Sequence, residues 1–149
     1  MNVDEVIARE CIRNAMATYN RGGDSADYNL LASVFHEEGV FIMNNGATSI
    51  EGRQNIANQL SQRARLRGHG IANDIFQRHN LTTNWIKFSG QSGAMAHTYF
   101  FVLSELGPDH AGEYTDRFVK CGDDWLIAER EVALDWMRPD SRFYQSIKP

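Results

Sequence analysis

The chain has 149 residues, of which 42% are hydrophobic and 23% charged, a composition typical of a single soluble globular domain. The formal net charge of −4 and the lack of a dense Lys/Arg cluster argue against nucleic acid as a partner. No apolar run approaches the ~20 residues of a membrane-spanning helix. The chain shows no secretory signal, and its two cysteines form no disulfide or metal motif, so we expect a cytoplasmic protein without a membrane partner.

The first part of the chain predicts two helices. Residues 3–21 carry apolar side chains at the spacing of one helix face, namely Val3, Val6, Ile7, Ile12, Ala15, Met16 and Tyr19. We expect Gly22-Gly23 to end this helix, because glycine readily adopts the left-handed conformation that closes one. Asp27 is then suited to cap a second, short helix.

A small hairpin and a third helix follow. Val40–Met43 is predicted to be a short strand, and Asn44-Asn45-Gly46 is a strong turn signal. The third helix should reach about Arg65, and a polar loop over 67–73 should follow it.

The second half of the chain reads as four strands, near 78–88, 94–105, 114–120 and 125–136, with a loop at 107–112. Three helices followed by an antiparallel meander predict an α+β fold, with the helices packed against a curved, mostly antiparallel sheet. A sheet curved in this way forms a cone whose concave face leaves a pocket. We expect one domain over 1–149, with 138–149 as a tail that covers the pocket mouth or a neighbouring subunit.

Two predicted strands carry histidines near their starts, His79 and His97. Strand side chains alternate between faces, so each histidine has a definite side. Met95, His97, Tyr99 and Phe101 share one face of their strand, but hydrophobicity alone does not show whether that face lines the pocket. The other three histidines, His36, His69 and His110, are predicted to lie at helix ends or in loops, and we assign them no site role.

Three stretches of the chain resemble the SnoaL-like proteins, which have the nuclear-transport-factor-like cone fold. They are Tyr19 to Asp24, Leu31 to Gly39, and Gly112 to Phe118 with the following Asp124 to Ile127 and Arg130. The resemblance covers roughly residues 5–137. It implies a cone-shaped α+β barrel.

Within that superfamily, the chain is most similar to the scytalone dehydratases. Asp24-Ser25-Ala26-Asp27-Tyr28 matches their Asp-x-x-Asp-aromatic context, and His79 and His97 match their two strand histidines. The hexachlorocyclohexane dehydrochlorinases have a comparable Asp–His dyad. The two tyrosines that hold a water in scytalone dehydratases are not matched, since Gly23 and about Asn44 occupy those places.

The resemblance implies a cofactor-independent lyase acting on a small apolar, aromatic or polyketide-like substrate. Histidine titrates near neutral pH, and a carboxylate bonded to it fixes its tautomer, so Asp24, His79 and His97 are the predicted catalytic residues. Predicted substrate-binding residues are Phe41, Tyr99, Phe101 and Tyr114. We expect no metal and no cofactor.

Simpler interpretations stay open. Asp24 could merely cap a helix, His79 could be a polar residue at a strand entrance, and His97 could bond a strand neighbour. A non-catalytic small-molecule binding protein and a structural small subunit of an aromatic-ring dioxygenase are the alternative functions. Exposed sheet surfaces in this fold favour a homodimer or homotrimer.

Overall fold

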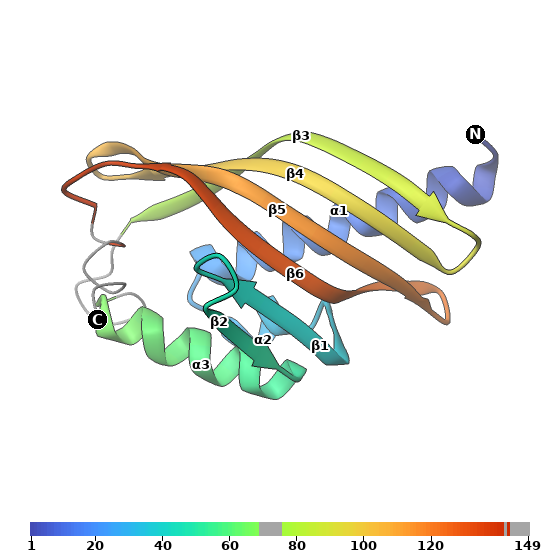
Figure 1. Ribbon diagram of the computed structural model, residues 1–149, viewed down its shortest axis with the longest axis horizontal. Coiled ribbons are helices and arrows are strands. Elements are labelled where there is room, and N and C mark those ends of the chain that lie inside the picture. Colours follow the sequence, from blue (N-terminus) through green and yellow to red (C-terminus); the bar gives the residue numbers. More distant parts are fainter. Residues whose placement is uncertain (69–75, 142, 144–149) are drawn as a thin grey trace.

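A computed structural model describes residues 1–68, 76–141 and 143 (Figure 1). The elements are α1 (Val3–Asp24), α2 (Tyr28–Ala32), β1 (Phe35–Met43), β2 (Thr48–Glu51), α3 (Arg53–Leu66), β3 (Gln77–Ser89), β4 (Gly93–Ser104), β5 (Gly107–Cys121) and β6 (Asp124–Met137). The six strands form one sheet in the order β2-β1-β6-β5-β4-β3. Only the β1–β6 pair is parallel among the described strand pairs. The sheet is therefore mixed, and β2 and β3 are its edges.

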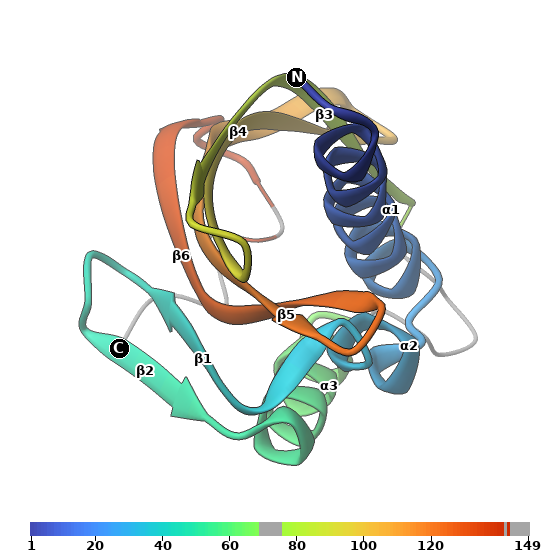
Figure 2. The same cartoon turned by 90° about the vertical axis from the view of Figure 1, so that its right-hand side faces the viewer.

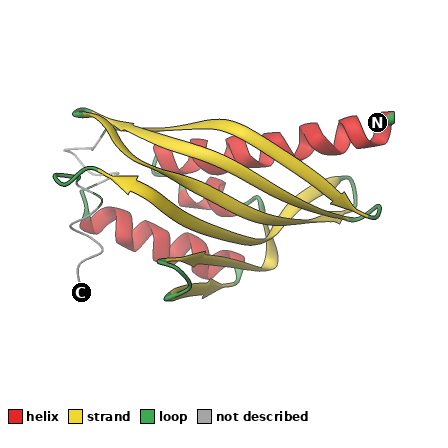
Figure 3. Cartoon of the chain, turned by 45° about the horizontal axis from the view of Figure 1, so that its top comes forward, coloured by secondary structure: helices red, strands yellow, loops and turns green. Residues whose placement is uncertain are grey.

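The predicted α+β architecture is confirmed. The sheet curves without closing, and its long strands bend around α1 (Figure 2). Helices form one layer and the sheet the other (Figure 3). The core lies between them, where Ile12, Met16 and Phe118 are almost fully buried. None of the helices in the described parts of the chain is long and apolar enough to cross a membrane.

Helix α1 begins at a conventional cap but ends later than expected. The Asn2 side chain accepts a hydrogen bond from the Glu5 backbone N–H at 2.8 Å, as an N-cap residue does. The prediction that Gly22-Gly23 ends the helix is wrong, because α1 continues to Asp24. Gly22 serves a close approach instead, since a Cβ there would overlap the backbone nitrogen of Leu31. The longer helix carries Asp24 to the start of β3.

The expected short helix and hairpin are present. Asp27 caps α2, accepting from the Leu30 backbone N–H at 2.9 Å. The turn between β1 and β2 places Asn44, Asn45 and Gly46 at positive φ, the conformation that these residue types tolerate best.

The expected loop at 107–112 is instead the first part of β5. Pro108 lies near the start of the strand, where the missing N–H costs little. The β4–β5 register shifts at Val102 and Leu103, so the strand is irregular there. His110 therefore has a defined face, opposite Val102 on β4. Of the predicted polar loop, residues 69–73 lie outside the described residues.

Candidate active site

Asp24 and His79 meet where the last residue of α1 reaches the start of β3. Nδ1 of His79 lies 2.6 Å from Oδ1 of Asp24, and the His79 backbone N–H donates to Oδ2 at 3.0 Å. Both side chains are largely buried. An ionised carboxylate only accepts hydrogen bonds, so the proton of the neutral imidazole belongs on Nδ1. Nε2 then carries the lone pair and is the basic atom of the pair.

His79 lines a cavity of about 460 Å³ between the helices and the concave face of the sheet. Most of the wall is aromatic or aliphatic, contributed by Tyr19, Tyr28, Leu31, Phe41, Met43, Leu60, Phe100, Tyr114, Val132, Leu134, Met137 and Phe143. The rings of Phe100 and Tyr114 stack with centroids 4.4 Å apart, and Phe100 lies 6.2 Å from the His79 ring. These ring-lined walls suit a small, flat, apolar molecule.

A second His–Asp pair, which the sequence did not reveal, contacts the same cavity. His110 lines the wall from β5, and its Nδ1 lies 2.8 Å from Oδ1 of Asp109. The Ser141 hydroxyl also donates to Oδ1 of Asp109, at 2.6 Å. Burial lowers the pKa of His110 below its usual value, and the hydrogen bond to Asp109 opposes this only in part.

Tyr114 and Asn20 form a polar spot on the wall. The Tyr114 hydroxyl donates to Oδ1 of Asn20 at 3.3 Å, while Nδ2 of Asn20 has no partner among the described residues. Burial raises the pKa of Tyr114 well above its usual value, so the phenol stays protonated and remains a donor.

Behind these residues lies a fully buried ion pair between Asp116 and Arg130. Two hydrogen bonds of 2.7 Å join the guanidinium to the carboxylate, and the rings of Tyr19 and Tyr114 both pack on the guanidinium, with centroids 4.1 and 4.2 Å from its Cζ. Burial alone would lower the pKa of Arg130, but Asp116 more than offsets it and the net shift is upward. The pair holds the aromatic wall in place without lining the cavity.

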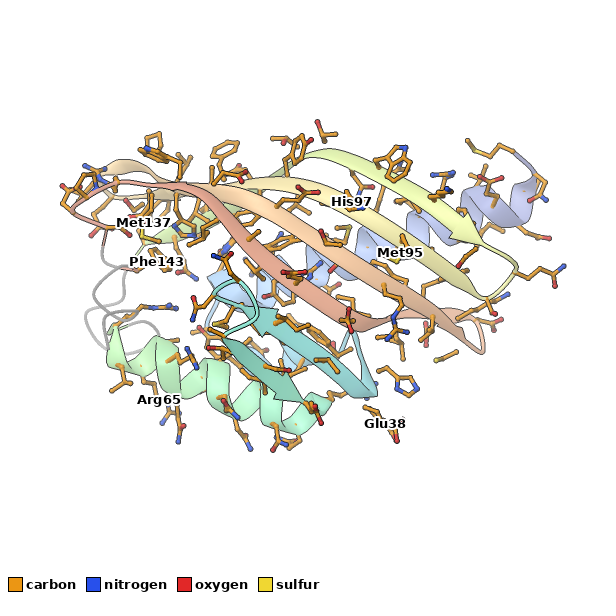
Figure 4. The ribbon with its side chains drawn as sticks, in the orientation of Figure 1. Glu38, Arg65, Met95, His97, Met137 and Phe143 are labelled. Carbon is orange, nitrogen blue, oxygen red and sulfur yellow. The ribbon has the colours of Figure 1, made fainter. Side chains whose placement is uncertain are left out.

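Two arginines of α3 and its C-terminal end add positive charge to the wall. Arg63 and Arg67 both line the cavity, and neither has an acidic partner in the parts of the chain that are described. Burial lowers the pKa of Arg67, whose guanidinium lies over the Phe143 ring at 4.8 Å. Phe143 is thus packed between Arg67 and His110, at the end of the molecule where Figure 4 also places Met137. The predicted tail contributes to the cavity through this residue, while 142 and 144–149 lie outside the described residues.

His97 does not join the cavity, contrary to the expectation that both strand histidines share one pocket. The inner face of β4 is formed by Ala94, Ala96, Thr98, Phe100 and Val102, all buried, so its odd-numbered residues point outward. There His97 packs on Trp85, which it faces in the β3–β4 register, and its Nδ1 lies 2.7 Å from Oε1 of Glu113. The interpretation of His97 as bonded to a strand neighbour fits this position.

The predicted substrate-binding residues divide in the same way. Phe41 and Tyr114 line the cavity, whereas Tyr99 and Phe101 share the outward face of β4 with His97 and do not. Tyr99 is half exposed. The buried set of β4 faces the helices and the cavity, while the larger and more polar outward set stays partly exposed to solvent.

The described residues contain no cluster of three or more His, Cys, Asp or Glu side chains arranged to hold a metal ion. The chemistry that the cavity offers is therefore that of two imidazoles, each oriented by a carboxylate, beside hydrogen-bond donors and aromatic rings.

Comparison with known proteins supports the architecture. A family model described as a SnoaL-like domain matches residues 4–131. No curated protein sequence matches the chain.

Several solved structures have a similar fold at low sequence identity. The Mycobacterium tuberculosis protein Rv3472, of unknown function, has a TM-score of 0.79 and 22% identity, covering 96% of this chain and 86% of its own. A Novosphingobium aromaticivorans protein provisionally named scytalone dehydratase has a TM-score of 0.76 and 19% identity, with 93% and 91% covered. The hexachlorocyclohexane dehydrochlorinase LinA-type3 of Novosphingobium barchaimii has a TM-score of 0.77 and 14% identity, with 93% and 94% covered. At such identities the likeness concerns the fold alone.

Proposed function

This chain belongs to the SnoaL-like family, and on that premise we propose that it is a cofactor-independent lyase of the dehydratase type. Its substrate is a small, flat, largely apolar ketone with a leaving group β to the carbonyl. The single observation that carries the proposal is the Asp24–His79 dyad, with its basic Nε2 at an aromatic cavity large enough for a bicyclic molecule.

In the proposed reaction, Nε2 of His79 removes a proton from the carbon next to the carbonyl. Asp24 holds the imidazole in the required tautomer and stabilises the imidazolium that forms. The electron pair of the broken C–H bond then forms a double bond as the leaving group departs from the β carbon. General base catalysis of this kind is typically worth ~10²–10⁴-fold in rate.

The negative charge that develops on the carbonyl oxygen must be stabilised by a hydrogen-bond donor. We assign this role to Asn20, because its Nδ2 lacks a described partner and its Oδ1 is held by the hydrogen bond from the protonated Tyr114 phenol. Donors placed before the reaction stabilise such an oxyanion without further reorganisation. The polar spot would thus replace the water-holding tyrosines that this sequence lacks.

Two activities test the proposal. The first is exchange of the α hydrogens of 1-tetralone in D₂O, which needs only the base. The second is elimination from 3-chloro-1-tetralone, which yields 1-naphthol and is followed by fluorescence. We expect Asp24→Asn and His79→Asn each to slow both reactions by ~10²-fold or more. Asp27→Asn is the matched control, because Asp27 caps α2 and lies outside the cavity lining.

Wild-type rates in the Asp24 and His79 variants would refute the proposed base. Tight binding of 1-naphthol with no turnover of either compound would instead favour a ligand-binding protein.

A further inference from the structure

Two His–Asp dyads serve one cavity, and the proposed function uses only one of them. The ring centroids of His79 and His110 are 6.4 Å apart and their planes meet at 82°. Phe100 lies beside both rings, at 6.2 and 6.1 Å. The two imidazoles are thus close enough to contact neighbouring atoms of the same small substrate.

The His110 side chain is held in place as firmly as that of His79. Its side chain is 8% exposed and that of Asp109 only 2%. Asp109 is fixed in turn by the Ser141 hydroxyl, while its backbone carbonyl accepts from the Arg138 N–H at 2.9 Å. Nδ1 of His110 is committed to Asp109, and this is the one hydrogen bond that the His110 ring makes within the described residues, which leaves Nε2 uncommitted. A buried, oriented imidazole with one uncommitted nitrogen at a cavity wall is the usual arrangement of an acid–base group.

A second acid–base group matters because some leaving groups must be protonated before they can depart and others need not be. Chloride departs as a stable anion. Hydroxide is a poor leaving group and must receive a proton as the C–O bond breaks. A cavity for dehydrochlorination requires one base, whereas a cavity for dehydration gains from a base and an acid.

We propose that His110, oriented by Asp109, is the general acid that protonates a departing hydroxyl group, so that the substrates of this cavity are β-hydroxy ketones. The inference rests on the proposed function, since it assumes that His79 removes the α proton.

The proton balance is simple. His79 takes the α proton, the C–H electron pair forms the carbon–carbon double bond, and the C–O bond breaks. Nε2 of His110 gives its proton to the departing oxygen, which leaves as water. His79 ends protonated and His110 neutral, so one net proton passes from His79 to His110, through solvent, before the next turnover.

The charges around His110 set the pH at which it can act. Asp109 favours its protonated form, while burial, the neighbouring His79 and Arg67 at the end of α3 disfavour it. The balance lowers the pKa of His110 below 6.5, which makes the imidazolium a stronger acid but confines it to acidic solution. Dehydration should therefore slow as the pH rises through the lowered pKa of His110, beginning below 6.5, and continue to slow at higher pH. Reactions that need only the base should not slow over that range.

Three probes separate the two histidines: 1-tetralone for α exchange, 3-chloro-1-tetralone for elimination of chloride, and 3-hydroxy-1-tetralone for elimination of water. The last two give the same 1-naphthol. We expect His110→Asn to slow dehydration by ~10²-fold or more while changing the other two reactions less than about threefold. Asp109→Asn should have the same selective effect. The fall in dehydration rate with rising pH should disappear in His110→Asn and move to lower pH in Asp109→Asn, because Asp109 favours the protonated form of His110.

Each outcome of this experiment supports or refutes a stated role of His110 or of the cavity. Equal loss of all three reactions in both variants would mean that His110 only supports the cavity, and unchanged dehydration would refute its role as the acid. A wild-type protein that eliminates chloride but not water would overturn the inference and leave the proposed base intact. Failure on all three probes would overturn the proposed function and the inference that rests on it. Retained α exchange shows in the same experiment that the variants are folded.

Discussion

At the residue scale, three aspartates at or near the cavity have different partners and different roles. Asp24 and Asp109 orient imidazoles whose second nitrogens are uncommitted, whereas Asp116 commits both oxygens to Arg130. The Asp116 carboxylate is therefore not available to orient a histidine. We therefore separate the residues that act on substrate from the Asp116–Arg130 pair that holds the wall.

The buried pair makes a stability prediction. Arg130→Met leaves the Asp116 carboxylate buried without a counter-ion, which typically costs about 3–5 kcal/mol of unfolding free energy. The double variant Arg130→Met/Asp116→Leu removes both charges and should recover a large part of that loss. Urea unfolding followed by tryptophan fluorescence measures both. A single variant as stable as the wild type would show that the pair contributes little.

The residues also show where sequence reasoning succeeds. Asp24 and His79 lie 55 positions apart, and resemblance to a family brought them together before any geometry was known. His110 escaped notice because Gly107, Pro108 and Gly112 suggest a loop, and a histidine in a loop has no defined face. The adjacency of Asp109 and His110 was the available signal. The face of the sheet on which His110 lies, however, depends on the β4–β5 register shift near the start of β5.

At the element scale, the end of α1 decides where Asp24 lies. Glycines at 22 and 23 suggested a helix stop, because a left-handed C-cap and a close helix contact both select glycine. Sequence cannot distinguish the two uses. The structure assigns Gly22 to the contact with α2, and the left-handed residue is Ala26, at φ 57°.

Two neighbouring substitutions test this assignment. Gly22→Ala should destabilise the protein by about 1–3 kcal/mol, because its Cβ would overlap the backbone of Leu31 and Asp27. Gly23→Ala is the matched control, since the nearest atom to its Cβ is the Leu31 Cδ1 at 3.5 Å and alanine favours helix by about 0.5–1 kcal/mol. Thermal unfolding compares them. Equal effects would contradict the close-contact role of Gly22.

At the scale of the whole molecule, the sheet has two faces of different character. Alternation predicted which residues share a face of β4, but not which face turns inward, because both sets contain apolar side chains. Packing against α1 settles this in favour of the smaller set. The larger set stays outside, where Trp85 is 55% and Tyr99 51% exposed.

Such an outer face leads to the last prediction. Trp85, His97 and Tyr99 lie together on β3 and β4, and an exposed aromatic surface of this kind marks an interaction site. We expect the chain to form a homodimer or homotrimer through it. Trp85→Lys combined with Tyr99→Lys should shift the species seen in sedimentation velocity to the monomer.

The control for this prediction is Leu66→Lys, because Leu66 is 87% exposed and ends α3, which packs mainly against α2, β1 and β2. Its sedimentation should match the wild type. Since the outer face and the cavity lie on opposite sides of the sheet, the double variant should keep α exchange of 1-tetralone. A wild-type chain that is monomeric at all concentrations would refute the association, and an unchanged oligomer in the double variant would place the contact elsewhere.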